Sequence, residues 1–366
     1  MKPKSQIVNI PVYEPGKPIE EVKRELGLSE VIKLASNENP YGASPRVKEA
    51  VLAELDNISL YPDGGAVELT AEVARFLGVE PGQIIFGCGS DEVIALICRA
   101  FLVSGDETIM ADQTFSVYKS NADIEGAVSI EVPLVDGKHD LEAMLARLSS
   151  KTKIVWICNP NNPTGTILSE TELTGFLDQV PSDVMVVLDE AYFEYVTDLS
   201  YPDGSKLLSQ YPNLVVLRTF SKIYGMASLR IGYGVAQPEV IQLINRVREP
   251  FNTTRAAQAA AKAALGDQEY VANCRIANAE GIKQLQAEFD RLGLDYFPAH
   301  GNFIMVNVRK PAVEMFQSLL QKGIIVRAGF GKYPNHVRVT VGSEEQNKAF
   351  IHALEQVLSE DKAQVQ

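Results

Sequence analysis

Short apolar segments alternate with helical segments from about Ala50 to Gly234, and this alternation restricts the fold more than any other feature of the chain. The apolar segments, rich in Val, Ile and Leu, are residues 83–87, 107–111, 128–134, 153–158, 184–190 and 214–220. Because the pattern is apolar on both faces of such strands, we expect a mostly parallel sheet sandwiched by helices. One intervening helix should begin after Ser169, since Glu172 completes a capping box.

The pattern changes after about Pro250, which predicts a second, smaller lobe. An Ala-rich helix at residues 256–265 is followed by candidate strands at 303–308, 324–329 and 336–342, with a helix at 313–323. This mixture is typical of an α+β domain. We therefore predict an N-terminal arm that packs with the small domain (residues 1–46), a large domain (47–250) and a small C-terminal domain (251–366).

Charge and composition exclude several classes of protein. The chain has 366 residues, with 47 acidic and 34 basic side chains and a net charge of -13. Binding to nucleic acid or to an anionic membrane is not expected on this balance, so an anionic ligand needs a local site. The four cysteines form no C-x-x-C pair and the four histidines show no metal-ligand spacing, so we expect no metal site. No signal peptide or membrane-spanning segment is recognisable, and a cytoplasmic location is expected.

Ligands of open α/β sheets lie at the carboxyl ends of the strands, which makes the residues after each strand candidates for a site. After 83–87, Ser90 is expected to cap a helix that opens with Asp91, and such a helix start binds anions. An ordinary capped helix is the alternative. After 153–158 comes NPNNPTG, Asn159–Gly165, a rigid turn that would aim the amide of Asn162 into the crevice. A plain surface turn is the alternative here.

The next two strands end in ionisable side chains. Asp189 follows an apolar run, so its carboxylate should be partly buried and in need of a partner; Tyr192 could share the same cleft. An ion pair or a helix cap would also explain Asp189. Lys222 follows the last strand, and burial beside cations would lower its pKa, as Schiff-base chemistry requires. Judged alone, it would be a solvated lysine.

The four loops together provide groups that fit a single ligand. They offer an anion-binding helix start, an amide, a buried carboxylate and a lysine, to which the stretch TFSKIYGMASLR adds the phosphate-binding candidates Thr219, Ser221 and Arg230. Phosphate, phenolic oxygen, ring nitrogen and aldehyde are the functional groups of pyridoxal 5'-phosphate. The combination predicts a site for this cofactor with Lys222 as the reactive amine.

The same motifs resemble a known family. NPNNPTG, the DEAY stretch from Asp189 and SK-x-x-G-x-x-x-LR from Ser221, in this order, are similar to those of the fold-type I pyridoxal-phosphate aminotransferases. The resemblance extends to both ends of the chain. Residues 13–27, 31–42, 61–65 and 336–342 resemble the histidinol-phosphate aminotransferases. The resemblance implies an aspartate aminotransferase-like fold with a seven-stranded sheet and a small domain.

The resemblance also implies roles for individual residues. Lys222 would carry the cofactor, Asp189 would pair with its ring nitrogen, and Asn162 and Tyr192 would bind its phenolic oxygen. Tyr118 would stack on the ring. The phosphate would be held by Ser90, Asp91, Thr219, Ser221 and Arg230, with Tyr61 reaching it from the partner subunit of a homodimer. The residues implied for the substrate are Arg338, Arg327, Tyr13, Asn39, Tyr61 and Asn302.

The implied reaction is transamination of L-histidinol phosphate with 2-oxoglutarate in histidine biosynthesis. An aromatic amino acid aminotransferase or a threonine-phosphate decarboxylase would use the same cofactor residues, because specificity depends on a few pocket side chains. A non-catalytic regulatory module on the same fold is a further alternative. Such modules carry an added DNA-binding segment, and the arm of this chain is short and not basic.

Overall fold

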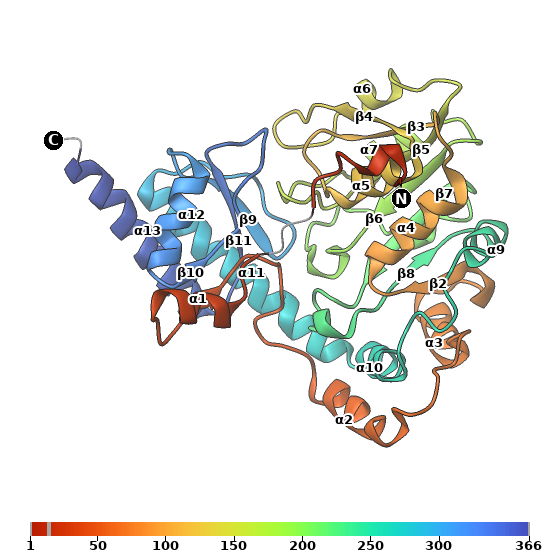
Figure 1. Ribbon diagram of the computed structural model, residues 1–366, viewed down its shortest axis with the longest axis horizontal. Helices are drawn as coiled ribbons and strands as arrows, with labels where there is room; N and C mark the ends of the chain where they lie inside the picture. The colour runs from red at the N-terminus through yellow and green to blue at the C-terminus, as the bar shows by residue number, and fades with distance from the viewer. Residues whose placement is uncertain (1, 13–15, 365–366) are drawn as a thin grey trace.

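The computed structural model describes residues 2–12 and 16–364, and its largest element is a seven-stranded sheet (Figure 1). The strand order is β2-β8-β7-β6-β5-β3-β4, and β8 alone runs antiparallel to its neighbours. The strands are β2 (Ile84–Gly87), β3 (Glu107–Ala111), β4 (Val128–Val132), β5 (Thr152–Cys158), β6 (Met185–Asp189), β7 (Leu214–Thr219) and β8 (Gly232–Val235). The predicted mostly parallel sheet is confirmed.

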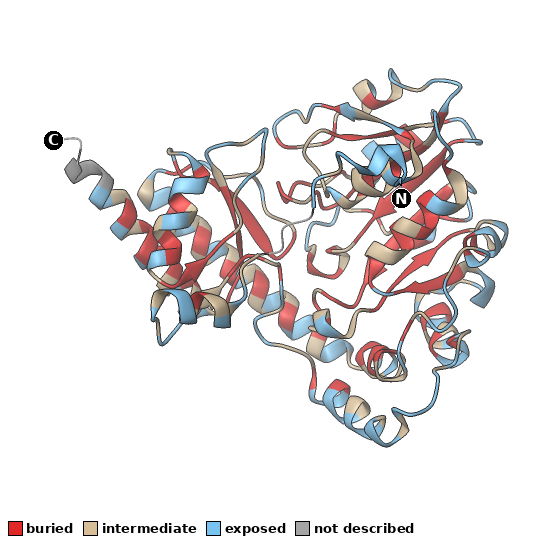
Figure 2. Ribbon diagram, in the orientation of Figure 1, coloured by how far each residue is buried: buried red, intermediate tan, exposed pale blue. Residues whose placement is uncertain are grey.

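Helices cover both faces of this sheet, as its apolar strands require. One face packs against α4 (Ser90–Phe101), α5 (Val117–Glu125) and α9 (Pro238–Asn245). The other packs against α3 (Val67–Leu77), α6 (Leu141–Leu145), α7 (Glu170–Leu177), α8 (Gly204–Leu207) and α10 (Arg255–Leu265), with α2 (Pro45–Ala53) beside α10. The central strands are buried between these layers (Figure 2). The capping box of Ser169 and Glu172 at the start of α7 is confirmed.

One strand of the sheet was not found from the sequence pattern. β8 is only four residues long and contains Gly232 and Gly234, so it carries little apolar signal. Close packing explains why residue 232 is a glycine. A Cβ atom there would lie 2.5 Å from the backbone nitrogen of Ser90, at the start of α4. The glycine therefore allows β8 to pass close beneath the helix start that borders the candidate site.

The small lobe contains two short sheets and the long C-terminal helices (Figure 1). β9 (Phe303–Asn307) pairs antiparallel with β11 (His336–Thr340), and β1 (Ile32–Lys33) pairs parallel with β10 (Ile324–Ile325). The helices α1 (Ile19–Leu26), α11 (Gln268–Leu292), α12 (Ala312–Gln321) and α13 (Glu344–Gln364) complete it. β1 belongs to the N-terminal arm, so the arm is hydrogen-bonded to the small lobe through β10.

The domain boundary at residue 250 stays a prediction. Helix α10, which follows it, contributes Ala257, Ala260 and Ala261 to the core of the large sheet. Helix α11 begins in that core with Val271 and reaches the core of the small lobe at Leu285. In the described part of the chain, short 3-10 helices lie at Ser5–Ile7, Leu55–Asn57, Pro81–Gln83, Phe193–Tyr195 and Ala227–Leu229. Within residues 2–12 and 16–364, no helix is long and apolar enough to cross a membrane.

A buried charge cluster lies directly behind the edge where β6 and β7 end. Arg218 of β7 donates from Nε to Glu190 at 3.0 Å and from Nη2 to Asp203 at 2.7 Å. Arg218 and Glu190 are 2% and 0% exposed. Burial raises the pKa of Glu190 to about 7, and the guanidinium opposes this rise. Since Glu190 follows Asp189 in the chain, the cluster fixes the backbone that carries the candidate carboxylate.

Replacing Arg218 should destabilise the protein strongly. Arg218→Met leaves the buried Glu190 without its cation, and removal of one partner from a buried pair costs about 3–5 kcal/mol. Urea unfolding followed by circular dichroism measures this loss. The control is Arg291→Met, which removes two half-exposed surface ion pairs and should leave stability nearly unchanged. Equal effects of the two substitutions would contradict the structural role of the cluster.

Candidate active site

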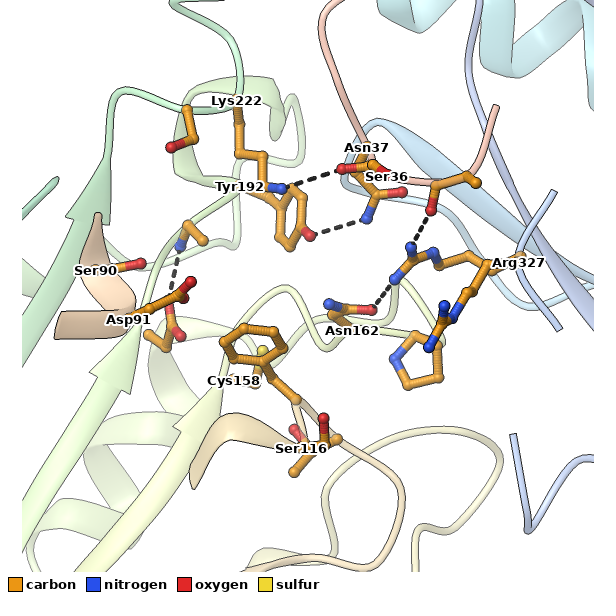
Figure 3. Close-up of a pocket in the computed structure, with 18 of the residues that line it drawn as sticks. Ser36, Asn37, Ser90, Asp91, Ser116, Cys158, Asn162, Tyr192, Lys222 and Arg327 are labelled. Atoms are coloured by element: carbon orange, nitrogen blue, oxygen red, sulfur yellow. Dashed lines mark hydrogen bonds between the residues drawn. The ribbon is translucent and has the colours of Figure 1, made fainter. Parts of the chain in front are cut away.

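A cavity of about 320 Å³ lies at the carboxyl ends of β5, β6 and β7, where the small lobe faces the large sheet (Figure 3). The large sheet and its loops contribute most of the wall. The small lobe contributes Arg338 from β11 and the segment that begins at Arg327, and the N-terminal arm contributes Ser36 and Asn37. Most of the predicted site residues line this cavity: Ser90, Asp91, Asn162, Asp189, Tyr192, Thr219, Ser221, Lys222, Arg230, Arg327 and Arg338.

Lys222 follows β7 and points into the cavity (Figure 3). Its Nζ donates to the carbonyl oxygen of Ser36 at 3.4 Å and lies 5.6 Å from the ring centroid of Tyr192. Burial lowers its pKa to about 8, and the guanidinium of Arg338 lowers it further than that of Arg230. The lowered pKa enlarges the fraction of Lys222 that is a neutral, nucleophilic amine near neutral pH.

Asp189 ends β6 and is 3% exposed. Its Oδ1 accepts from the backbone N–H of Ala191 at 3.1 Å, and its Oδ2 accepts from the hydroxyl of Tyr118 at 2.6 Å. Burial raises its pKa to about 6, while these hydrogen bonds oppose the rise. A cationic group in the cavity would stabilise the ionised carboxylate.

An anion cradle forms where α4 begins. The N-cap of α4 is Gly89, with φ of 78°, and the helix itself opens with Ser90, so the prediction of Ser90 as the cap is wrong. A left-handed φ favours glycine, and a Cβ at this position would lie 2.6 Å from Nη2 of Arg230. Arg230 also donates to the hydroxyl of Ser221 and to the carboxylate of Asp91, both at 3.4 Å. A helix start, a hydroxyl and a guanidinium thus converge on one side of the cavity, which suits a phosphate.

The NPNNPTG turn joins the cavity to the small lobe. Both Asn-Pro peptide bonds, before Pro160 and Pro163, are cis. The side-chain oxygen of Asn162 accepts from Nη1 of Arg338 at 2.5 Å. Nη2 of Arg338 donates to the backbone oxygen of Ala35 at 2.6 Å. Arg338 is 8% exposed, so these contacts position a buried cation in the cavity wall.

Asn37 is a cavity residue that the sequence reasoning missed. It donates from Nδ2 to the hydroxyl of Tyr192 at 2.9 Å (Figure 3). Its Oδ1 accepts from the hydroxyl of Thr340 in β11 at 3.0 Å. The side-chain amide of Asn37 therefore connects β11 to Tyr192 through two hydrogen bonds. Its φ of 56° marks a left-handed conformation, which asparagine tolerates better than most residues. The signal available in the sequence was its place in the LASNENPYG segment.

Besides Tyr61, which was expected in the site of a partner subunit, three predicted site residues do not line the cavity. Tyr118 is fully buried, with its ring stacked on Trp156 at 4.9 Å, so it has no free face for a ligand. The aromatic side chain of this segment that lines the cavity is Phe115, which is half-buried. The spacing of the two rings explains the error, because α5 turns Tyr118 inward toward the sheet.

The other two misplaced residues, Asn39 and Asn302, hold the backbone of the arm instead of facing the cavity. Asn39 donates from Nδ2 to the backbone oxygen of Ile223 at 2.7 Å. Asn302 is 1% exposed and donates to the backbone oxygen of Asn37 at 3.0 Å. Both act behind the cavity, on the segments that carry Lys222 and Asn37.

Tyr61 lies away from the cavity of its own chain, 79% exposed and stacked on Phe251 at 4.8 Å. Its role across a subunit interface stays a prediction. Tyr13 lies outside the described residues. Within the described part of the chain, no group of three or more His, Cys, Asp or Glu side chains could hold a metal ion.

This fold, with its lysine, carboxylate and anion cradle, is that of an aminotransferase: residues 29–354 match the family model of aminotransferase class I and II, and the chain belongs to this family. It is 55% identical over 360 residues to the histidinol-phosphate aminotransferase of Brevibacillus brevis, which covers 98% of this chain and 99% of that protein. The same enzyme of a Geobacillus species is also 55% identical, over 361 residues, with 98% and 99% covered.

A solved structure agrees with these relatives. The histidinol-phosphate aminotransferase of Sinorhizobium meliloti, in complex with pyridoxal-5'-phosphate, superposes with a TM-score of 0.90 at 27% identity, and the match covers 97% of both chains. The full-length relatives place the chain among the histidinol-phosphate aminotransferases. The family and the fold type expected from the sequence are confirmed.

The pKa of Lys222 should depend on Arg338. Arg338→Met removes the cation that most disfavours the ammonium form, so the pKa of Lys222 should rise above about 8. Labelling of the cofactor-free protein with trinitrobenzenesulfonate, followed by mass spectrometry of the Lys222 peptide, reports the neutral fraction at each pH.

Arg230→Met is the matched control, because Arg230 has the weaker effect on the same amine. It should move the labelling curve upward by less than Arg338→Met. An unchanged or lowered midpoint in Arg338→Met would contradict the electrostatic assignment.

Proposed function

We propose that this protein transaminates L-histidinol phosphate with 2-oxoglutarate, giving imidazole acetol phosphate and glutamate, and that the cell uses the reverse direction to make histidine. The full-length relatives named histidinol-phosphate aminotransferase support this activity. The observation that carries it is structural: an amine of lowered pKa, a buried carboxylate and a buried guanidinium meet in one cavity of this chain.

The proposed cofactor is pyridoxal 5'-phosphate, and the cavity fits it. The cofactor supplies an aldehyde that takes up the amino group and a ring that accepts electrons from the substrate carbon. The cradle of α4, Ser221 and Arg230 would hold its phosphate, and the half-buried ring of Phe115 is placed to cover one face of its ring. Asp189 would hold a proton on the ring nitrogen, and Asn162 and Tyr192 would bind the phenolic oxygen.

The side chains of this protein move and hold protons in the reaction. Lys222 is the base that would take a proton from the substrate carbon, since its pKa of about 8 leaves the amine partly neutral. Tyr192 and the oxygen of Ser36 flank the amine and limit its positions. The ionised Asp189 would hold the proton on the ring nitrogen.

Arg338 is the proposed anchor for both substrates. A guanidinium binds a carboxylate or a phosphate with the same fork geometry, so Arg338 can serve glutamate and histidinol phosphate in turn. Arg327 lies beside it in the cavity wall, paired to it through a backbone bridge. Histidinol phosphate has no α-carboxylate, and its phosphate would take this position.

The first experiment is an absorption titration of the purified protein. We expect a cofactor band that disappears on adding histidinol phosphate and returns on adding 2-oxoglutarate. A band that responds only to phenylalanine or tyrosine would indicate an aromatic amino acid aminotransferase. Loss of carbon dioxide from threonine phosphate would indicate the decarboxylase. Absence of any band after addition of pyridoxal phosphate would overturn the assignment of Lys222.

Substitution of the two central residues should remove activity for different reasons. Lys222→Ala deletes the base and should abolish turnover. Asp189→Ala leaves the ring nitrogen without an anion and should lower kcat by several orders of magnitude. Steady-state kinetics with histidinol phosphate measures both losses.

The controls for these variants are Lys151→Ala and Asp183→Ala. They remove exposed side chains just before β5 and β6, at the opposite edge of the sheet, and should leave kcat unchanged. Wild-type activity in Lys222→Ala, or a loss of tenfold or less in Asp189→Ala, would contradict the proposed roles.

We further propose a cytoplasmic homodimer. An apolar surface, the 52–67 patch, exposes the side chains of Leu52, Leu55, Ile58, Leu60, Tyr61 and Val67 on one side of the large lobe. Several large apolar side chains exposed along one short segment are typical of interaction sites in soluble proteins. A second copy bound there would carry Tyr61 toward the phosphate cradle of its partner. The small metabolites of the proposed pathway support the cytoplasmic location.

Charge placed in this patch should separate the dimer. Ile58→Asp replaces an apolar side chain, 81% exposed in the single chain, by a carboxylate. We expect a monomer by analytical ultracentrifugation and weaker cofactor retention, because Tyr61 of the partner is then lost. The control is Val313→Asp, an exposed apolar position on α12 of the small lobe, which should stay dimeric. A dimer in Ile58→Asp, or a monomeric wild type, would contradict the proposal.

A further inference from the structure

The contact between Tyr118 and Asp189 has no assigned role, although it is the shortest hydrogen bond that the carboxylate accepts among those described. The hydroxyl lies 2.6 Å from Oδ2, and both side chains are buried. Burial raises the pKa of Tyr118 well above its usual value, so the phenol stays protonated. The hydrogen therefore belongs to Tyr118 and is donated to Asp189.

The position of this hydroxyl is fixed by packing that lies mostly behind the cavity wall. The ring of Tyr118 stacks on Trp156 of β5 with an interplanar angle of 10°. The Nε1–H of Trp156 donates to the hydroxyl of Thr108 in β3 at 2.6 Å. The ring of Phe115 contacts Tyr118 edge to face at 5.5 Å. Trp156 and Phe115 thus hold the phenol in one orientation, with its hydroxyl toward the end of β6.

Asp189 is surrounded by groups of different sign. From α4, Asp91 raises its pKa, and from the loop after β7, Lys222 lowers it. The thiol of Cys158 on β5 is neutral, because burial raises its pKa to about 12, and Tyr192 is a neutral phenol beside the carboxylate. Burial is the largest effect and favours the protonated acid. The hydrogen bond from Tyr118 is the largest effect in the opposite direction.

We propose that Tyr118 is a positioning residue for the transamination, and that its hydroxyl holds Asp189 ionised and turned toward the cavity. The inference rests on the proposed function in one respect, namely that Asp189 pairs with the ring nitrogen of the cofactor. Oδ2 is held by Tyr118 and Oδ1 by the N–H of Ala191, so the plane of the carboxylate is set from two sides. An oriented, charged carboxylate is the form that can keep a proton on a ring nitrogen.

Tyr118→Phe tests the inference, because it removes the hydroxyl and keeps the stacked ring. In the cofactor-free full-length protein, infrared titration gives the pKa of Asp189 directly, after subtraction of the spectrum of Asp189→Asn. We expect the pKa to rise from about 6 by about one to two units, the size of a lost hydrogen bond to a charged group. An unchanged pKa would overturn the inference.

The holoenzyme gives a second readout. In Tyr118→Phe the acidic limb of kcat should move to higher pH, with KM for histidinol phosphate little changed and activity recovering in alkali. A merely structural role would lower kcat equally at every pH, and that outcome would also overturn the inference.

The matched control is Tyr211→Phe. It removes another hydroxyl that donates to a carboxylate, that of Asp178 at 2.8 Å, outside the cavity wall. Neither the titration of Asp189 nor the pH profile should move. If the wild type fails to transaminate, the proposed function fails, and the infrared titration still decides the role of Tyr118.

Discussion

Burial of two ionisable groups at one edge of the large sheet is the constraint around which the site is arranged. Desolvation pushes both groups toward their neutral forms: it raises the pKa of Asp189 to about 6 and lowers that of Lys222 to about 8. The two effects have opposite value for the chemistry. A neutral lysine is a nucleophile, whereas a neutral aspartate no longer stabilises a cation. The surroundings accordingly supply Asp189 with hydrogen-bond donors and supply Lys222 with a neighbouring guanidinium.

The cavity is completed by the N-terminal arm, which links the lobes. Ser36 accepts from Lys222, Ala35 accepts from Arg338, and Asn37 joins Thr340 to Tyr192. These neighbours lie on the large sheet and on β11, so a few residues of the arm contact both sides of the cavity. Close packing fixes this segment: a Cβ on Gly225 would lie 2.0 Å from the backbone oxygen of Gly42. Movement of the small lobe therefore cannot leave the surroundings of Lys222 unchanged.

Much of this arrangement could be predicted from the chain, because strand ends are visible in sequence. Asp189, Lys222 and Asn162 each follow an apolar run, and the carboxyl ends of parallel strands meet at one edge. The predictions that failed concerned features set by side-chain direction or by contacts between residues far apart in sequence. β8 was not predicted because its glycines give little apolar signal. Tyr118 was predicted as the cavity ring in place of Phe115, because the start of α5 decides which ring faces the sheet. Asn37 is recruited by Thr340, which lies 303 residues away in sequence, and no local pattern reports such a contact.

Arg338 links substrate binding to the state of the lysine. Its guanidinium lowers the pKa of Lys222 while it holds Asn162 and the arm in place. Under its proposed role, an arriving carboxylate or phosphate offsets that positive charge, so the effect on Lys222 weakens and the pKa of the amine rises. Before an anion binds, the lower pKa enlarges the neutral, reactive fraction of the free amine. Once the anion is in place, the same amine becomes a stronger base, at the step where it must accept a proton. The buried guanidinium of Arg338 on β11 can thus serve both stages, because the anion that it binds offsets its positive charge.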